Sequence, residues 1–426
     1  MEHTARRLLN VPHYTLAMGV ETGTELHGHA GQSASDPMTL ALGSRLLHIG
    51  PHKTGTTALQ NTLIWDREKL PAQGLEYLVA GERRNANFAA RAIRQRPTQK
   101  LESPDSVPMH LWTNLVQQAK ATTADRVLIS GEGFADCNAD EIQRIAHDLD
   151  PSRLHVAVTL RPLAKILTSQ WQQYIQNNMK RASLDRFLHE TLDPEPQSSE
   201  SGFWRRHRHD LLVSRWSAPI GAENLTVIVV DDREPELIMR AFERLTGLRE
   251  GTLTPNRNPI NRSLTLAETE IVRAYYLLME EQGFNPRVYR KGVSIRPALY
   301  LKEHRNPGPE EVKIQLPAWA AERTREISAT IVNGIQKSGV RVIGDLDSLK
   351  RATSNEDAQQ VHIPAELAAH LAVGMLAKSG LARKKSEPKV VPARSTLKRV
   401  AERISASSRV GNVAISIARR LARRFV

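Results

Sequence analysis

The segment 45–60, RLLHIGPHKTGTTALQ, constrains the fold of this chain more than any other stretch. An apolar run over 46–49 ends at Gly50, and a short loop then leads into a helix that we expect to begin near Thr56. The first backbone N–H groups of a helix have no partner within the helix, and the helix dipole is positive at that end. A strand, a glycine-containing turn and a helix start in this order therefore predict a cradle for an anion.

The loop has the glycine spacing of a Walker A loop but not its lysine. Gly50 and Gly55 are correctly spaced, whereas a threonine follows Gly55 and the lysine stands earlier, at position 53. The run Lys-Thr-Gly-Thr-Thr is instead similar to the 5′-phosphosulfate loop of sulfotransferases, which use 3′-phosphoadenosine 5′-phosphosulfate (PAPS) as sulfuryl donor. The resemblance implies a donor-binding loop formed by Lys53, Thr54, Gly55, Thr56 and Thr57. An ordinary glycine-rich strand-to-helix turn is the alternative interpretation.

A second motif follows about 100 residues later. The β-branched run 154–160 predicts a buried strand, with Arg161 at its carboxyl end and a helix after Pro162. Ser169 lies eight positions after Arg161, which is about two helical turns. Sulfotransferases bind the 3′-phosphate of the donor with an Arg and a Ser at this spacing, so the resemblance implies that role for Arg161 and Ser169. The planar donor fork of arginine matches phosphate geometry.

The chain resembles the bacterial branch of the PAPS-dependent sulfotransferases over about 45–350, where 211–232 and 339–349 also look like segments of that branch. The resemblance implies a three-layer P-loop-like α/β fold with a central parallel sheet flanked by helices. It departs from the cytosolic members at Ala58, where they often place a tryptophan. Their later Arg-Lys-Gly-x-x-Gly pattern is retained only at 290–292, because an isoleucine stands at position 295.

The alternation of elements supports this fold class. Apolar β-rich runs lie at 45–50, 126–130, 154–160 and 225–230, and this alternation of strands and helices predicts a parallel sheet covered on both faces. The helical patterns between the runs lie at 55–70, 109–121, 139–149, 163–178 and 203–216. Further helices are predicted at 264–283, where Ser263 or Thr265 is available as a cap and Glu268 follows, and at 317–337 and 363–380. A strand is predicted at 340–343. We divide the chain into a flexible leader (1–43), an α/β domain (44–350), a helical extension (351–385) and a basic tail (386–426).

Sulfuryl transfer needs a group that stabilises the leaving phosphate and a base for the acceptor. Lys53 is predicted for the first role, and no metal is expected. Glu132 follows the strand 126–130, and by analogy with glycan-type sulfotransferases it is predicted as the base, although it could merely cap its turn or pair with an arginine. His52, in the donor loop, is the rival base. His207 and His209 are predicted to lie on a solvated helix face or to help bind an anionic acceptor.

Charge is concentrated at the end of this 426-residue chain. Of the net charge of +13, residues 381–426 carry +11, which leaves +2 for the remaining 380, so nucleic-acid binding is not expected. One cysteine excludes an intramolecular disulfide, and no apolar run approaches 18 residues. With no apparent secretory signal, we expect a cytoplasmic protein. Apolar residues every four positions within 396–426 predict a basic amphipathic helix that binds the anionic inner face of the membrane. A disordered tail, or a helix docked on the rest of the protein, is the alternative.

The sequence thus predicts a sulfotransferase that moves a sulfuryl group from PAPS to a hydroxyl or amine, with a carbohydrate or glycolipid as one acceptor class. Two other functions stay open. A P-loop kinase or nucleotidase would need a Walker B strand, and Val227–Asp231 is the nearest imitation. A non-enzymatic basic module associated with membrane or nucleic acid would explain the tail but not the paired donor motifs. The acceptor itself and the oligomeric state are not predicted.

Overall fold

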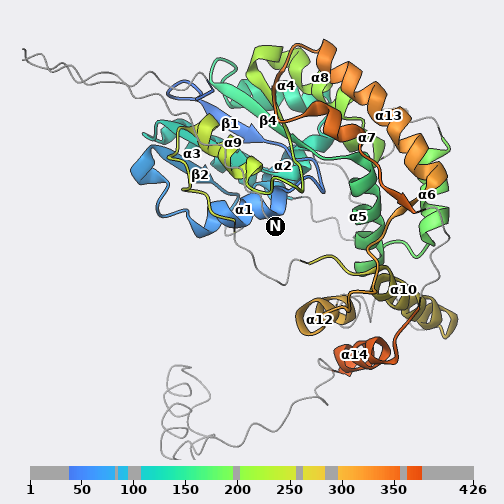
Figure 1. The fold of residues 1–426 in the computed structure, drawn as a ribbon. Helices are drawn as coiled ribbons and strands as arrows, with labels where there is room; N and C mark the ends of the chain where they lie inside the picture. Colours follow the sequence, from blue (N-terminus) through green and yellow to red (C-terminus); the bar gives the residue numbers. More distant parts are fainter. Residues whose placement is uncertain are drawn as a thin grey trace, which may run out of the picture.

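The protein is built around a six-stranded parallel sheet, seen here in a computed structural model (Figure 1). The structure describes residues 38–81, 85–94, 107–194, 202–255, 262–283, 296–355 and 362–376. The strand order is β2-β3-β1-β4-β5-β7. The strands are β1 (Arg45–His48), β2 (Leu75–Leu78), β3 (Arg126–Ser130), β4 (Leu154–Leu160), β5 (Leu225–Val229) and β7 (Arg341–Ile343).

Both faces of this sheet are buried, as the continuous apolar runs of its strands predict. All seven residues of β4 are buried, and β1 pairs with β3 and β4 on its two sides, so that Arg45 lies opposite Val127 and Leu154. Successive side chains of a strand point to opposite faces. Leu46 accordingly packs in one hydrophobic core and Leu47 in the other. The predicted α/β fold class, with a central parallel sheet flanked by helices, is confirmed.

Helices cover the two faces unequally. Helices α1 and α9 pack on one face, while α3, α4 and α8 cover the other, with α13 packed on α8 (Figure 1). The helices of these layers are α1 (Thr56–Trp65), α2 (Asn87–Arg94), α3 (His110–Ala121), α4 (Ala139–Asp148), α5 (Leu163–Gln176), α6 (Leu184–Leu192), α7 (Trp204–His207), α8 (His209–Ile220), α9 (Leu237–Thr246) and α13 (Ala318–Lys337). The helix predicted over 203–216 is therefore two helices, which meet at Arg208.

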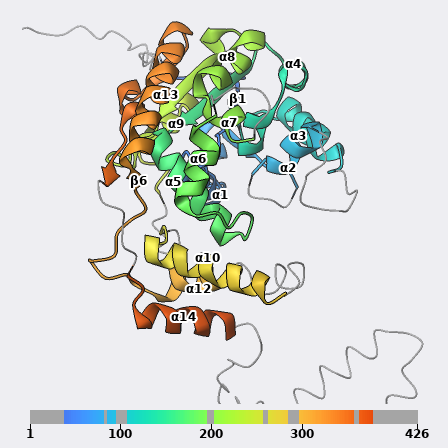
Figure 2. The same cartoon turned by 90° about the vertical axis from the view of Figure 1, so that its right-hand side faces the viewer.

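Three further helices form a separate group, which we call the helical module: α10 (Leu266–Glu281), α12 (Arg296–His304) and α14 (Ala365–Leu376). Figure 2 shows them stacked at one end of the molecule, beyond α5 and α6. Helix α10 begins with a capping box between Thr265 and Glu268, as the sequence predicts. Helix α14 packs closely on α12, where a Cβ on Gly374 would lie 2.9 Å from the Cβ of Tyr300. Two stretches far apart in the sequence thus build one unit.

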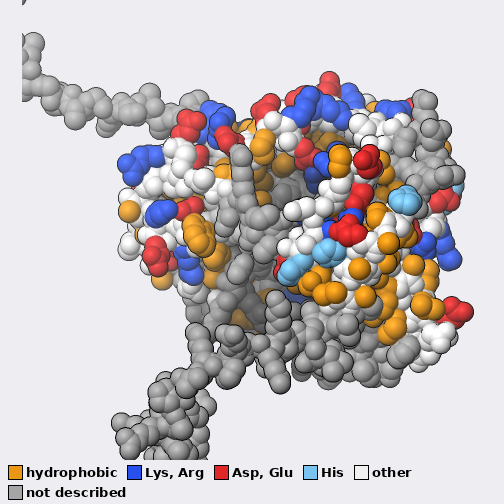
Figure 3. All heavy atoms as spheres, turned by 60° about the horizontal axis from the view of Figure 1, so that its bottom comes forward, with side chains coloured by type: hydrophobic (Ala, Val, Ile, Leu, Met, Phe, Trp, Pro, Cys, Tyr) orange, Lys and Arg blue, Asp and Glu red, His pale blue; other side chains and the backbone are white. Residues whose placement is uncertain are grey.

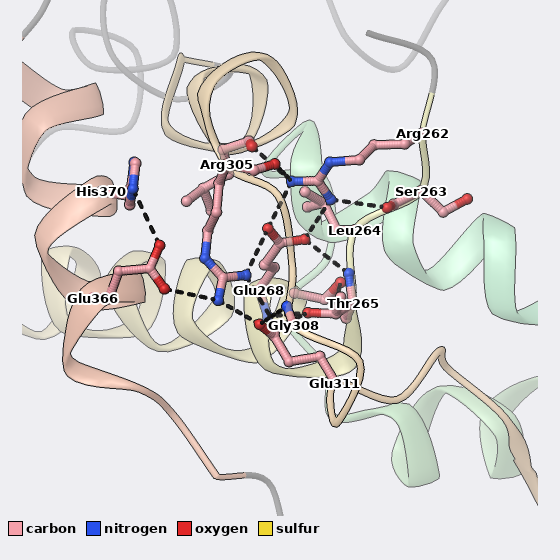
Figure 4. Close-up of polar contacts among 12 residues, drawn as sticks. Arg262, Ser263, Leu264, Thr265, Glu268, Arg305, Gly308, Glu311, Glu366 and His370 are labelled. Carbon is pink, nitrogen blue, oxygen red and sulfur yellow. Dashed lines mark hydrogen bonds and ion pairs between the residues drawn. The ribbon is translucent and has the colours of Figure 1, made fainter. Parts of the chain in front are cut away.

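Buried ion pairs hold the helical module together (Figure 4). The side chain of Arg305, only 1% exposed, bonds to Glu268 on α10, to Glu311 in a loop and to Glu366 on α14. Arg262 adds a second guanidinium to Glu268, at 2.7 Å. Removing two charges from water is costly, and only several good hydrogen bonds offset that cost. This network meets the condition, because each buried charge in it has more than one partner.

The outer surface of the helical module is partly apolar. Figure 3 looks at the molecule from this side, and hydrophobic side chains gather on it. The helical module itself has large exposed apolar side chains at Leu277 and Leu278 on α10 and at Val373 on α14. No helix within the described residues is both long and apolar enough to cross a membrane. The predicted amphipathic tail at 396–426 and the residues 290–292 lie outside the described residues.

Candidate active site

A cavity of about 300 Å³ lies where the carboxyl ends of β1, β3 and β4 meet. Its walls come from the loop after β1, the start of α1, the turn after β3, the end of β4 and one face of α5. The lining residues are His52, Lys53, Gly55, Thr56, Thr57, Ala58, Glu132, Arg161, Ser169 and Gln173. Every site residue that the sequence predicts is among them except Thr54, so both donor motifs and both candidate bases share one cavity.

The loop after β1 has an unusual backbone. Gly50 and Gly55 have φ values of 79° and 87°, which glycine adopts without strain, but Lys53 also lies in the left-handed region, at 71°. A lysine in that region is strained, and such strain is typical of functional loops. Left-handed residues at positions 53 and 55 turn the chain sharply before α1, and the side chains of His52 and Lys53 both line the cavity.

Helix α1 begins with backbone amides available at the cavity. Its N-cap is Gly55, which offers no side-chain cap, and the amides of Ala58 and Leu59 both donate to the Gly55 carbonyl. The amides of Thr56 and Thr57 precede these bonds and have no partner within the described part of the chain. Unpaired amides at the positive end of a helix dipole form a binding site for an anionic group. The observed geometry is thus that of the predicted cradle.

The threonines of the loop divide into two kinds. Thr54 is fully buried, and its hydroxyl donates to the carbonyl of Pro51 at 2.6 Å, so its side chain points into the protein. The hydroxyl of Thr56 also donates to Pro51, at 3.2 Å, and a hydroxyl has only one proton to give. Thr57 is exposed at the cavity. In this arrangement the hydroxyl of Thr57 and the amides are the loop's free donors toward an anion.

Arg161 and Ser169 also line the cavity. Arg161 follows β4, and its Nη2 donates to both carboxylate oxygens of Asp232 at 2.7 Å. Its Nε is buried and has no partner among the described residues. Ser169, on α5, lines the cavity and is half-buried. A buried N–H donor without a partner is costly, and an anionic oxygen would satisfy it. These donors fit a phosphate.

Lys53 is desolvated by the cavity wall. Burial lowers the pKa of its ammonium group from 10.5 to about 8. The carboxylate of Glu132 opposes this change, whereas the positive charges of Lys302, on α12, and of Arg161 add to it. An anion bound between these cations would favour the charged form of the lysine. Three positive side chains from three separate segments therefore influence the same cavity.

Glu132 and His52 are hydrogen-bonded to each other. Nδ1 of His52 lies 2.8 Å from Oε1 of Glu132, and the two side chains are 28% and 22% exposed. Burial raises the pKa of Glu132, but the hydrogen bond and charge of His52 outweigh it, together with the charges of Lys53 and Arg206. The net effect lowers the pKa of this carboxyl, so Glu132 is ionised. The two bases that the sequence suggested as rivals are thus neighbours.

A buried chain of hydrogen bonds lies beneath the cavity, and sequence reasoning missed it. His48, fully buried in β1, contacts the hydroxyl of Ser130 at 2.9 Å and that of Thr159 at 3.1 Å. Hydrogen bonds connect, in order, Asn85, Gln60, Ser130, His48, Thr159, Thr54 and the Pro51 carbonyl. Burial lowers the pKa of His48 to about 3, so the ring is neutral. A histidine inside an apolar strand was the available signal for this network.

The prediction that His207 and His209 lie on a solvated helix face is wrong. Both residues are 1% exposed, because α7 ends at His207 and the chain turns before α8 begins at His209. His207 packs on Phe203, with ring centroids 4.6 Å apart. Burial lowers the pKa of His209 to about 4 and that of His207 well below 6.5. Both rings are therefore neutral and belong to the core.

The strand that imitates Walker B offers no carboxylate to a metal. Asp231 follows β5, and its side chain accepts from both Arg233 and Arg351 at 2.6 Å. Hydrogen bonds from Arg233 hold the pKa of Asp231 far below its usual range. Within the described residues, no group of three or more His, Cys, Asp or Glu side chains is placed to hold a metal ion. The donor set of the cavity is cationic, which suits an anionic ligand rather than a cation.

No protein-family model matches the chain, and no curated protein matches it. Among solved structures, the chain is similar to a sulfotransferase from Alicyclobacillus acidocaldarius, with a TM-score of 0.41 and 13% sequence identity. The match covers 72% of this chain and 99% of that one. A likeness this distant does not establish a family, so the function has to be inferred from the residues of the site.

Proposed function

We propose that this protein is a sulfotransferase that uses PAPS as donor and transfers its sulfuryl group to a hydroxyl or amine. One observation supports this function most directly: the Lys53 loop and the Arg161–Ser169 pair line the same cavity. They lie about 100 residues apart in the sequence, and each resembles one of the two donor-binding motifs of sulfotransferases. PAPS carries phosphate groups at both its 5′ and 3′ positions, which two separate groups of donors can bind.

Each wall of the cavity takes one part of the donor in this proposal. The amides of Thr56 and Thr57, with the Thr57 hydroxyl, bind the 5′ end, and the backbone of Thr54 and Gly55 shapes that turn. Arg161 and Ser169, which line the same cavity, bind the 3′-phosphate. PAPS supplies an activated sulfuryl group whose leaving group is a phosphate. Lys53 places a positive charge at that leaving oxygen, where negative charge develops during transfer.

The acceptor enters on the side of Glu132 and His52. These two side chains are the bases that line the cavity, and an alcohol or amine acceptor must lose a proton during transfer. A carbohydrate or glycolipid is the acceptor class that we propose, since the chain resembles the bacterial branch of the sulfotransferases. We expect no metal in the reaction, because the positive charge comes from Lys53 and Arg161.

The kinase alternative has less support. A nucleoside triphosphate enzyme of the P-loop type needs lysine directly after the second glycine and a free carboxylate for magnesium. Thr56 occupies the lysine position. Both carboxylate oxygens of Asp231 accept from Arg233, and Oδ2 also accepts from Arg351. The non-enzymatic alternative assigns no ligand to the cavity, so it does not explain the unpaired amides or the unpaired Nε of Arg161.

Calorimetry without metal tests the proposal. We expect 3′-phosphoadenosine 5′-phosphate (PAP), the donor without its sulfuryl group, to bind more tightly than ADP or ATP. Arg161→Ala should weaken PAP binding by about 10- to 100-fold, as expected for the loss of a charged hydrogen bond. The same substitution should weaken ADP binding far less. Lys53→Ala should weaken the binding of PAP and of ADP to a similar extent. Lys165→Ala, an exposed lysine of α5, is the matched control.

Two results would contradict the proposal. One is ATP binding as tight as PAP binding, which would favour the kinase. The other is PAP binding that is unaffected by Arg161→Ala, which would separate this arginine from any 3′-phosphate.

A further inference from the structure

The cavity brings together a histidine and a carboxylate from two different loops. His52 follows β1, and Glu132 begins the 3-10 turn Glu132–Asp136 after β3. Their side chains meet at 2.8 Å, and both line the cavity beside Lys53. The pair belongs to the site of the proposed sulfuryl transfer, and any catalytic role for it rests on that proposed function.

The backbone fixes the approach of these two residues. A Cβ on Gly50 would lie 3.0 Å from the Cβ of Glu132 and 3.1 Å from its Cα, so only glycine allows this contact without a shift. The amide of Gly131 donates to the carbonyl of His48 at 2.9 Å and joins the ends of β1 and β3. The sheet and the close approach at Gly50 therefore bring the backbone segments that carry His52 and Glu132 together.

Proton accounting assigns the tautomer of His52. Glu132 is ionised, and an ionised carboxylate can only accept. The proton of the 2.8 Å bond is therefore on Nδ1 of His52, which leaves a lone pair on Nε2 when the ring is neutral. Nε2 has no hydrogen-bonding partner in the part of the chain that the structure describes. The ring thus offers a free proton acceptor at the cavity.

We propose that His52 and Glu132 act as a dyad, in which Nε2 of His52 takes the acceptor's proton and Glu132 holds the ring. As the acceptor oxygen bonds to sulfur, its proton moves to Nε2. The bond from sulfur to the bridging phosphate oxygen breaks, and its electron pair stays on that phosphate. The products are the sulfated acceptor, PAP and an imidazolium paired with Glu132, which then releases its proton to water. An amine acceptor follows the same balance through nitrogen.

The charges around the pair favour this division of roles. A good general base has a pKa near the working pH, and a carboxylate with a lowered pKa is a weak one. Glu132 faces the positive charges of Lys53 and Arg206, which keep it ionised and suit it to stabilise an imidazolium. Asp136 and the neutral His207 are the other titratable groups that interact with His52. Asp136 is itself bound by Arg206, at 2.6 Å.

Two substitutions separate the dyad from a lone glutamate base. His52→Asn keeps an N–H donor near the position of Nδ1 but has no Nε2. We expect it to bind PAP within about threefold of the wild type and to lose about 10²- to 10⁴-fold in hydrolysis of PAPS, where water replaces the acceptor. His52→Gln, which also lacks a basic nitrogen, guards against a folding defect in the first variant. His147→Asn, at a side chain that is 89% exposed, is the control.

A measurement on the resting protein tests the geometry without any turnover. In the NMR spectrum of protein labelled with ¹⁵N-histidine, we expect the His52 ring to show a protonated Nδ1 and an unprotonated Nε2. The signals of His52 are assigned as those that disappear in His52→Asn. Glu132→Gln should shift this ring toward the opposite tautomer, because the new amide can donate to Nδ1. Addition of PAP should leave the tautomer unchanged.

The outcomes distinguish this inference from the proposed function. Failure of the wild type to bind PAP would overturn the sulfotransferase proposal. PAP binding with His52→Asn hydrolysing PAPS within threefold of the wild type would leave the sulfotransferase in place and overturn the dyad. A His52 ring with its proton on Nε2 would overturn the dyad even if no hydrolysis is measurable.

Discussion

The guanidinium of Arg161 donates through one nitrogen to both carboxylate oxygens of Asp232, at 2.7 Å each, on the rim of the cavity. Asp232 is half exposed, at 49% of its side chain, whereas Arg161 is 25% exposed. Exposed ion pairs contribute little, because water screens them. The aspartate therefore holds the arginine in place but competes only weakly with a phosphate for it.

This competition leads to the first prediction. Asp232→Asn removes a negative charge beside the proposed 3′-phosphate site, so PAP should bind more tightly, by up to about fivefold. Calorimetry in low salt measures the change, and ADP should gain much less. Asp231→Asn is the control, because Asp231 pairs with Arg233 and Arg351 and not with Arg161. Weaker PAP binding in Asp232→Asn would mean that the pair orients Arg161 more than it competes.

The second prediction concerns the pH dependence of donor binding. Lys53 has a pKa lowered to about 8, and only its protonated form attracts a phosphate. PAP affinity should thus be nearly constant between about pH 7 and 8, where the PAP phosphates are fully ionised, and fall above pH 8 by up to about tenfold per pH unit. Lys53→Arg, which stays charged, should bind PAP with no such decline. A decline of equal size in both proteins would assign the titration to another group.

The third prediction concerns the loss of folding stability that the buried histidines cause at low pH. Burial lowers the pKa values of His48, His155 and His209 to about 3, 4 and 4, and that of His207 well below 6.5. Unfolded histidines take up protons below about pH 6.5 while these folded ones do not, so stability is lost as the pH falls toward 4. The free energy of unfolding should decrease by up to about 5 kcal/mol per pH unit.

Urea unfolding between pH 6.5 and 5 measures that slope, and one substitution isolates a single ring. His155→Gln keeps a polar partner for the Thr226 hydroxyl, which lies 2.8 Å from the histidine. It should reduce the slope by about 1.4 kcal/mol per pH unit. His147→Gln, at an exposed position, should leave the slope as it is. A slope that His155→Gln does not change would indicate that His155 is protonated in the folded protein.

The fourth prediction uses two glycines with the same φ angle. Gly50 and Gly251 both have φ of 79°, but a Cβ on Gly251 would meet nothing within 4 Å, whereas one on Gly50 would meet Glu132. Gly251→Ala should lose about 1–2 kcal/mol of stability from backbone strain alone. Gly50→Ala should lose more and should also slow PAPS hydrolysis by separating His52 from Glu132. Equal stability and equal activity in the two variants would show that the contact at Gly50 has no role.

The helices and strands that the sequence predicted correctly are those that a short stretch of sequence determines by itself. The strands at Arg126–Ser130 and Leu154–Leu160 are continuous apolar runs, and α10 begins at its predicted capping box. The short β2 was missed, because four residues carry too little pattern to distinguish a strand. Helix α9 was missed as well, since no side chain caps its start. Helix α6 had a usable signal in Ser183, whose side chain accepts from Arg186.

The site was predictable where its residues follow strand ends. Lys53, Glu132 and Arg161 all follow strands that the sequence predicts, and parallel strands bring their carboxyl ends to one edge of the sheet. The hydrogen bond between His52 and Glu132 could not be predicted, because it depends on the register of β1 against β3 and on the close approach at Gly50. The burial of His207 depends likewise on a turn at Arg208 that no sequence period indicates.

The helices of the helical module come from two distant parts of the sequence, so they are synthesised at different times. Helix α12 leaves the ribosome about 60 residues before α14, which is roughly 3 to 12 seconds of synthesis. In that interval β7 can complete the sheet, while Leu301 and Tyr300 on α12 still lack the helix that packs on α12, and Arg305 still lacks Glu366. Lys302, whose charge acts on Lys53, lies on that same helix. The helix whose charge acts on Lys53 therefore gains one of its packing partners only after the sheet is complete.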